Sequence, residues 1–172
     1  MIVWLNGTFG AGKTTTSKEL AALLPDARIF DSESVGYMLR HVLNSVPVKD
    51  FQEWLPWRGL VVETASQVLD FVGGVLVIPQ TVLVEQYWGE IHAGLAKAGI
   101  PVQHFVLHTD PDTLAQRIES DTVETGARQW RLDNISRYRE ALSWLRREAE
   151  IIDTTHLSPT QVAQTIAASV PS

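Results

Sequence analysis

The chain of 172 residues contains no cysteine, which excludes disulfide bonds, a thiolate nucleophile and a cysteine-based zinc site. It has no apolar run near the roughly 20 residues that cross a bilayer, and its N-terminus has no cationic lead, so we expect neither a membrane span nor a signal peptide. Positive charge is also scarce, since 14 Lys and Arg stand against 20 Asp and Glu, a net charge of −6. Nucleic acid is therefore not the expected partner, because its backbone is bound by clustered Lys and Arg. These absences predict a globular, cytoplasmic protein.

The apolar residues that are present alternate between two kinds of segment. Runs of strand length are predicted at 2–5, 27–30, 75–78, 102–107 and 150–153. Helical patterns lie between and after them, at 15–24, 35–43, 50–71 (kinked or divided at Pro56), 85–98, 110–119 and 130–147, and a capping box at Ser158–Gln161 opens a last helix. This alternation is typical of a parallel sheet covered on both faces, so we predict an α/β three-layer sandwich forming one domain over residues 1–172.

The strongest motif is the segment Gly7–Thr14, which matches the P-loop pattern G-x-x-x-x-G-K-[ST] between a predicted strand and a predicted helix. In this context the backbone N–H groups turn around an anion, and the helix N-terminus adds its dipole. Lys13 would reach the β- and γ-phosphates, and Thr14 would place its hydroxyl on Mg²⁺. The predicted ATP-binding residues of this motif are Gly7, Thr8, Phe9, Gly10, Ala11, Gly12, Lys13, Thr14 and Thr15.

Two carboxylates follow the second predicted strand, in the segment Asp31-Ser32-Glu33. Ligands of parallel sheets bind beyond the carboxyl ends of the strands, so either carboxylate could accept a substrate hydroxyl proton or hold Mg²⁺ and its water. The alternative is that Asp31 only caps the next helix. The third strand ends in Gln80-Thr81 without the acidic residue usual in many P-loop proteins, which leaves Asp31 as the expected carboxylate at the metal and Glu33 as the alternative base.

Arginines bracket a polar, glycine-containing segment late in the chain, and we interpret that segment as a lid at about 119–130. They are Arg117, Arg128, Arg131 and Arg137. Arginines that close over a triphosphate would neutralise charge on the transferred phosphoryl group, whereas the simpler interpretation is a solvated helix face. After the last predicted strand, Asp153 and Thr154 could touch the adenine edge.

An aromatic group with one arginine lies in the helical insertion at about 32–72, where the chain carries Phe51, Trp54, Trp57 and Arg58. Such a stripe is usually core. It could instead form a substrate site, with Trp54 and Trp57 as a wall beside an anion-binding Arg58.

The order of these motifs resembles the small P-loop metabolite kinases, which include nucleoside-monophosphate, shikimate and gluconate kinases. The segments 2–14, 57–58 and 76–81, and Trp130 followed by Arg137, look like the ATP-binding tunicamycin-resistance proteins. The resemblance implies a five-stranded parallel sheet of order 2-3-1-4-5 and matches Lys13, Asp31, Arg58, Arg117 and Arg137 by position.

The resemblance also implies an ATP- and Mg²⁺-dependent phosphotransferase acting on a hydroxyl of a small molecule, with a nucleoside antibiotic such as tunicamycin as one candidate. The alternatives are an ATP-binding protein that sequesters the antibiotic without chemistry, and a nucleoside-monophosphate kinase. The oligomeric state stays open.

Overall fold

A computed structural model describes residues 1–120 and 128–171, with side chains throughout except at 128–132. Its five strands are β1 (Ile2–Asn6), β2 (Ala27–Ile29), β3 (Val75–Pro79), β4 (Val102–His108) and β5 (Glu150–Asp153). They pair in parallel in the order β2-β3-β1-β4-β5, which confirms the predicted sheet. In this register Ile2 of β1 lies between Leu76 of β3 and Val102 of β4. The P-loop therefore leaves the central strand of the sheet.

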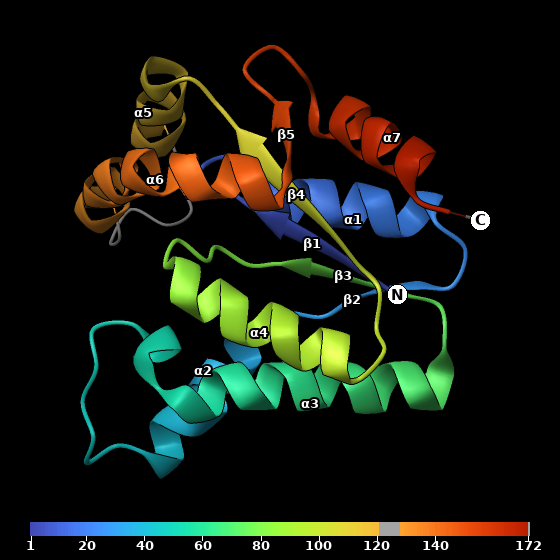
Figure 1. Ribbon diagram of the computed structural model, residues 1–172. Helices are drawn as coiled ribbons and strands as arrows, with labels where there is room; N and C mark the ends of the chain where they lie inside the picture. The colour runs from blue at the N-terminus through green and yellow to red at the C-terminus, as the bar shows by residue number, and fades with distance from the viewer. Residues whose placement is uncertain (121–127, 172) are drawn as a thin grey trace.

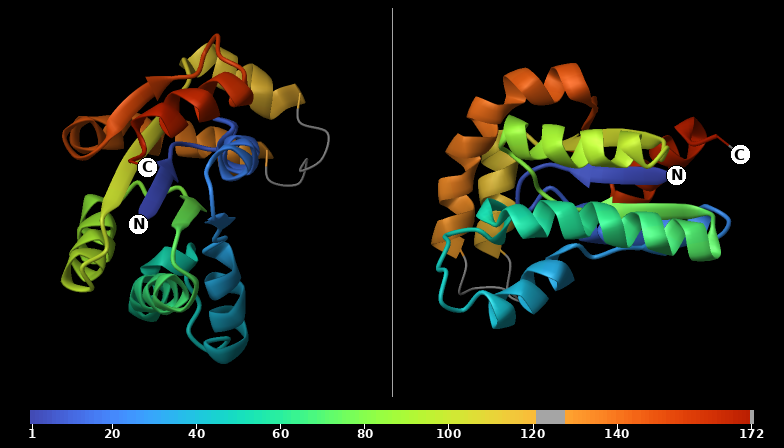
Figure 2. Two further views of the ribbon diagram at one scale, coloured as in Figure 1. Left: turned by 90° about the vertical axis from the view of Figure 1, so that its right-hand side faces the viewer. Right: turned by 60° about the horizontal axis from the view of Figure 1, so that its bottom comes forward.

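The helices cover both faces of this sheet (Figures 1 and 2). They are α1 (Lys13–Leu23), α2 (Glu33–Val42), α3 (Leu55–Val72), α4 (Glu85–Lys97), α5 (Pro111–Ser120), α6 (Arg128–Glu148) and α7 (Pro159–Ser169), with a short 3-10 turn η1 (Phe51–Glu53) before α3. Alternate residues of β1 serve the two layers: Val3 and Leu5 pack with α1 and α7, and Ile2 and Trp4 pack with α3, α4 and α6. Both faces of β1 are fully buried, which explains its unbroken apolar sequence.

The predicted helical insertion is formed by α2, η1 and α3. Of the two expectations for residues 50–71, a kinked helix or a divided one, the structure has the divided form, with the break before Pro56. Pro56 stands in the first turn of α3, where its missing N–H costs nothing, so it starts the helix and does not kink it. Residues 51–53 form η1, whose N-terminus is capped by a capping box between Asp50 and Glu53. Most of the lid predicted at 119–130 lies outside the described residues. Within the described part of the chain, no helix is long and apolar enough to span a bilayer.

Candidate phosphate-binding and acceptor site

The loop between β1 and α1 has the backbone geometry that a phosphate cradle needs. Gly7 has φ 129°, and a Cβ there would come within 2.6 Å of the Leu107 carbonyl oxygen. Gly12 has φ 90° and caps α1 without offering a side-chain acceptor to its first N–H groups. Those N–H groups are the donors that an anion takes at a helix N-terminus. The two glycines are thus required by close approach and by a left-handed conformation.

The ammonium of Lys13 lies over this loop. Its Nζ donates to the carbonyl oxygens of Gly7 at 3.0 Å and Thr8 at 2.9 Å, and it lies 5.5 Å from the centre of the Phe9 ring. Lys13 is half-buried, while Thr14 and Thr15 are exposed at the start of α1. The structure therefore places the charged and hydroxyl side chains of the motif around one loop.

The carboxamide of Asn6, the last residue of β1, connects the P-loop to the neighbouring strands. Its Oδ1 accepts from the N–H of Gly7 at 2.8 Å and of Val82 at 3.0 Å, and its Nδ2 donates to the Val82 carbonyl at 2.9 Å. Thr81 adds a hydroxyl hydrogen bond to the Gly7 carbonyl at 2.7 Å. The start of the P-loop and the end of β3 are therefore held as one unit. The sequence prediction had given neither residue a role.

His104 on β4 supports Asn6 from the other side. Burial lowers the pKa of His104 to about 3, so the ring is neutral. Its Nδ1 lies 3.2 Å from the Glu148 carbonyl, which only accepts, so Nδ1 carries the proton. Nε2 is then the acceptor for the Asn6 Nδ2 at 3.3 Å. This arrangement links the end of α6 to the P-loop.

The two carboxylates after β2 lie on the phosphate side of the molecule. Asp31 is exposed, and its Oδ1 accepts at 3.0 Å from the N–H of Glu33, the first residue of α2, as a capping side chain does, although the N-cap residue itself is Ser32. Burial and the neighbouring Asp31 raise the pKa of Glu33, and Lys13 opposes that rise. Ser32, which stands between the two carboxylates, donates to Gln80, and the next residue, Thr81, donates to the Gly7 carbonyl, so the segment lies beside the P-loop. The capping role and the position beside the cradle are therefore combined in one segment.

A buried polar network surrounds Gln80 and Thr81, which follow β3 at the position where many P-loop proteins carry an acidic residue. Ser32 Oγ donates to Gln80 Oε1 at 2.7 Å, and the Nε2 of Gln52 donates to the Thr81 carbonyl at 2.7 Å. All four side chains are at most 7% exposed. These bonds fasten the carboxylate segment and η1 to the P-loop strand pair.

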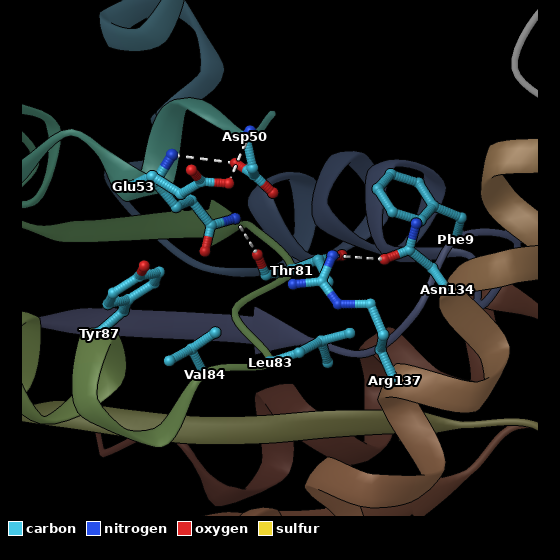
Figure 3. Close-up of a pocket in the computed structure, with 10 residues that line it drawn as sticks. Phe9, Asp50, Glu53, Thr81, Leu83, Val84, Tyr87, Asn134 and Arg137 are labelled. Carbon is cyan, nitrogen blue, oxygen red and sulfur yellow. Dashed lines mark hydrogen bonds between the residues drawn. The ribbon is translucent and has the colours of Figure 1, made fainter. Parts of the chain in front are cut away.

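A cavity of about 210 Å³ opens beside the P-loop (Figure 3). Its walls come from four separate segments: the P-loop, η1, the stretch from the end of β3 into α4, and α6. The lining residues are Phe9, Asp50, Gln52, Glu53, Thr81, Leu83, Val84, Tyr87, Asn134 and Arg137. Arg137 points from α6 into the space and donates to the Asn134 Oδ1 at 3.2 Å. Of the arginines predicted near the lid, Arg137 is thus placed at this cavity.

The aromatic wall predicted in the insertion does not line this cavity. Trp57 is 0% exposed, donates from its indole to the Ser32 carbonyl at 3.1 Å and packs on Phe51, so it is core. Trp54 is also buried, and its indole donates to the Val46 carbonyl at 3.0 Å. Both tryptophans therefore hold the segments of the helical insertion to one another.

Arg58 also differs from the expected anion-binding residue. Its Nε pairs with Glu90, its Nη1 donates to the Gln52 carbonyl, and its guanidinium lies 4.3 Å from the centre of the Tyr87 ring. Its side chain is only 8% exposed. Because Gln52 and Tyr87 line the cavity, we reassign Arg58 from substrate contact to support of the cavity wall.

On the other side of the P-loop lies a second cavity, of about 260 Å³, between the start of α1, Arg117 and the segment after β5. Arg117 donates to the Thr109 hydroxyl at 3.3 Å and to the Thr154 carbonyl at 3.1 Å. Thr154 lines this cavity, whereas Asp153 is exposed and accepts from the Thr155 N–H at 2.9 Å. Arg117 and Thr154, both predicted to bind ATP, thus lie at one cavity next to the P-loop. The side chain of Arg131 lies outside the described residues.

The fold and this site define a P-loop nucleotide-binding protein of the kinase-like class. Residues 2–142 match the family described as AAA domain (AAA_33), and the chain belongs to this family.

Solved structures support this assignment. The chain is similar to the tunicamycin resistance protein of Deinococcus radiodurans, with 29% identity, a TM-score of 0.72 and coverage of 97% of this chain and 93% of that one. It shares the fold of a sugar kinase from Janibacter sp. (17% identity, TM-score 0.69, coverage 97% and 92%). A shikimate kinase from Bacteroides thetaiotaomicron has the same fold (14% identity, TM-score 0.65, coverage 98% and 97%). No curated protein sequence matches the chain.

Proposed function

We propose that the protein is an ATP-dependent phosphotransferase that moves the γ-phosphoryl group to a hydroxyl of a small molecule. The observation that carries this proposal is the meeting of three features at one end of the sheet. These are a P-loop with Lys13 over it, the carboxylate segment Asp31–Glu33, which is joined to the P-loop through Gln80 and Thr81, and the cavity lined by Phe9 and Thr81. Positioning and charge stabilisation are what phosphoryl transfer asks of a protein.

The proposed step begins with an acceptor hydroxyl in the cavity. Its proton passes to Asp31, or to Glu33 as the alternative base, while its oxygen bonds to the γ-phosphorus. The bond from that phosphorus to the β,γ-bridging oxygen breaks, and ADP leaves with the electron pair. Lys13 and Arg137 stabilise the charge on the transferred group, as Arg131 would from its position on α6.

The nucleotide would lie along the P-loop, with its base in the second cavity beside Arg117 and Thr154. Asp153, at the end of β5, would help to orient the segment that forms this cavity, through its bond to the Thr155 N–H. Mg²⁺ would be held near the phosphates, away from the base, by the side-chain oxygens of Thr14 and Asp31. The Thr14 hydroxyl and the Asp31 carboxylate are both exposed there, and Mg²⁺ is typically held by one or two protein oxygens together with phosphates. The ion would neutralise phosphate charge.

The acceptor itself is part of the proposal. Similarity to a tunicamycin resistance protein makes a nucleoside antibiotic such as tunicamycin the first candidate, with resistance by phosphorylation as the outcome. A second candidate function is sequestration of the antibiotic by an ATP-bound protein without chemistry. It is favoured by Gln80, a neutral side chain where many P-loop enzymes carry an acidic one.

Mass spectrometry distinguishes the two functions. The protein is incubated with MgATP and a panel of nucleosides, sugars and tunicamycin, and Lys13→Ala serves as the matched inactive control. Gain of one phosphoryl group by an acceptor with the wild-type protein alone supports the transferase. ATP-dependent retention of an unchanged antibiotic supports sequestration and overturns the transferase.

A further inference from the structure

Arg58 lies behind the wall of the cavity on the side of α3 and α4, and its guanidinium is bound by groups of the protein itself. Arg58 is 8% exposed, and Glu90 of α4 and the Gln52 carbonyl both accept from it. The Tyr87 ring covers the guanidinium at 4.3 Å. Its positive charge is thus balanced by a carboxylate within the wall, and an acceptor in the cavity meets Gln52 and Tyr87 in its place.

The side chains that do line the cavity carry more negative than positive charge. Asp50 and Glu53 contribute two carboxylates, and among the described lining residues Arg137 is the cation that faces them. Asp50 is the N-cap residue of η1 and Glu53 is its last residue. Asp50 Oδ1 accepts from the Gln52 N–H at 2.9 Å, and Glu53 Oε1 accepts from the Asp50 N–H at 3.2 Å. These bonds hold the carboxylates at the cavity edge, as Figure 3 shows.

The rest of the lining mixes apolar and neutral polar side chains. Phe9, Leu83 and Val84 are apolar, Thr81 and Asn134 can form hydrogen bonds with hydroxyls, and the volume of about 210 Å³ is below the range usual for drug-sized ligands. The cavity therefore suits one small ring or the reacting end of a larger molecule.

We propose that this cavity selects a hydroxylated ring without negative charge and rejects acceptors that carry a carboxylate or phosphate on the bound ring. This inference rests on the proposed phosphotransferase function and adds the chemical class of its acceptor. Asp50 and Glu53 repel an anion and also face Arg137, the cation of the described lining, while the neighbouring Arg58 is paired with Glu90. Specificity in such a site comes from this repulsion as much as from attraction.

The test uses matched pairs that differ in one charge: uridine with uridine 5′-monophosphate, and glucose with glucuronate. Binding of each is measured by titration calorimetry to the full chain saturated with Mg²⁺ and a non-hydrolysable ATP analogue, which blocks the nucleotide site. We expect the uncharged member of at least one pair to bind at least about tenfold more tightly, because like charges brought together in a binding site cost more than the 1.4 kcal/mol that tenfold represents. Equal or tighter binding of the anionic members, or binding of no member, overturns the inference.

Two variants locate the source of the discrimination. Asp50→Asn removes one negative charge from the cavity and keeps the cap of η1, since Asn caps as well as Asp. It should reduce the ratio of the affinities for the uncharged and the anionic member of a pair at least about threefold. Glu90→Gln removes the carboxylate that balances Arg58 and should shift the ratio in the same direction. Asp70→Asn on α3 and Glu85→Gln on α4 make the same charge changes at exposed positions outside the cavity lining and should leave the ratio unchanged. A ratio that moves equally in all four variants would show a general effect of net charge and refute the assignment to the cavity.

Transfer measured by mass spectrometry on the same pairs separates this inference from the proposed function. If uncharged members bind selectively without being phosphorylated, the phosphotransferase proposal fails and the charge selection stands. If anionic members are phosphorylated preferentially, transfer is established and the charge selection fails.

Discussion

Truncation of Arg58 offers the sharpest test of how the cavity wall is built. If Arg58 were the anion-binding substrate residue that the sequence suggested, Arg58→Ala would impair acceptor use and leave the protein folded. The structure instead predicts a loss of stability, because Ala removes a buried guanidinium with three partners: Glu90, the Gln52 carbonyl and the Tyr87 ring.

The expected magnitude follows from these partners. The charge-assisted bond to the buried Gln52 carbonyl contributes about 1.5–3 kcal/mol, and the contact with Tyr87 about 0.5–1 kcal/mol. The side chain of Glu90 is 33% exposed, so solvent screens its ion pair and limits that contribution to about 1 kcal/mol. The free energy of unfolding should therefore fall by about 2–5 kcal/mol, a large share of the 5–15 kcal/mol typical of a domain.

Urea denaturation of Arg58→Ala measures this loss, and the melting temperature should fall by roughly 10 °C. The matched control is Arg147→Ala, which breaks the ion pair with Glu85 where both side chains are more than half exposed, and it should cost less than about 1 kcal/mol. A cycle with Glu90→Ala isolates the pair itself. If Arg58→Ala is no less stable than Arg147→Ala, the wall role is refuted, and a selective loss of acceptor binding would return Arg58 to the substrate site.

Three further predictions concern charge at the site. Lys13→Ala should weaken MgATP binding by about 2–3 kcal/mol, roughly 30- to 150-fold, with an unchanged melting temperature, and unchanged affinity in titration calorimetry would contradict the P-loop assignment. Asp31→Asn can still cap α2, so ATP should bind while single-turnover transfer falls by about 10²–10⁴-fold; a near-normal rate would shift the role of base to Glu33. Burial raises the pKa of Asp50 in the folded protein, so folding is penalised once pH exceeds the ordinary carboxyl range and that penalty vanishes below it. Asp50→Asn should therefore unfold at higher urea than wild type at pH 7 and at equal urea near pH 3, and a constant difference across this range would argue against the burial effect.

Local patterns predicted the parts of the fold that depend on neighbouring residues. The unbroken apolar run at Ile2–Leu5 indicated a strand covered on both faces, and both faces are indeed buried. The capping box at Ser158 and Gln161 is present, with the Ser158 side chain accepting from the Gln161 N–H at 3.3 Å. Such signals are read within a few residues, so one sequence suffices to find them.

The cavity could not be predicted in this way, because its walls meet only in the folded chain. Tyr87 and Gln52 carry no motif, and their segments are joined through Thr81 and Arg58. Arg58 was misassigned for the same reason: its partner Glu90 lies 32 residues further along the chain, on another helix. An arginine beside an aromatic pair has the same local sequence whether a carboxylate of the protein or of a ligand neutralises it.

The resting position of Lys13 determines what the arrival of a nucleotide costs. On binding a nucleotide, the half-buried ammonium would exchange the carbonyl oxygens of Gly7 and Thr8 for phosphate oxygens. The carbonyls it leaves are not abandoned, since Thr81 stays on Gly7 at 2.7 Å and the Ala11 N–H stays on Thr8 at 3.4 Å. Each oxygen keeps one donor, which avoids the penalty of a buried unsatisfied acceptor. We therefore expect Lys13 to move from the two carbonyl oxygens to phosphate oxygens while the hydrogen bonds from Thr81 and Ala11 keep the loop in place.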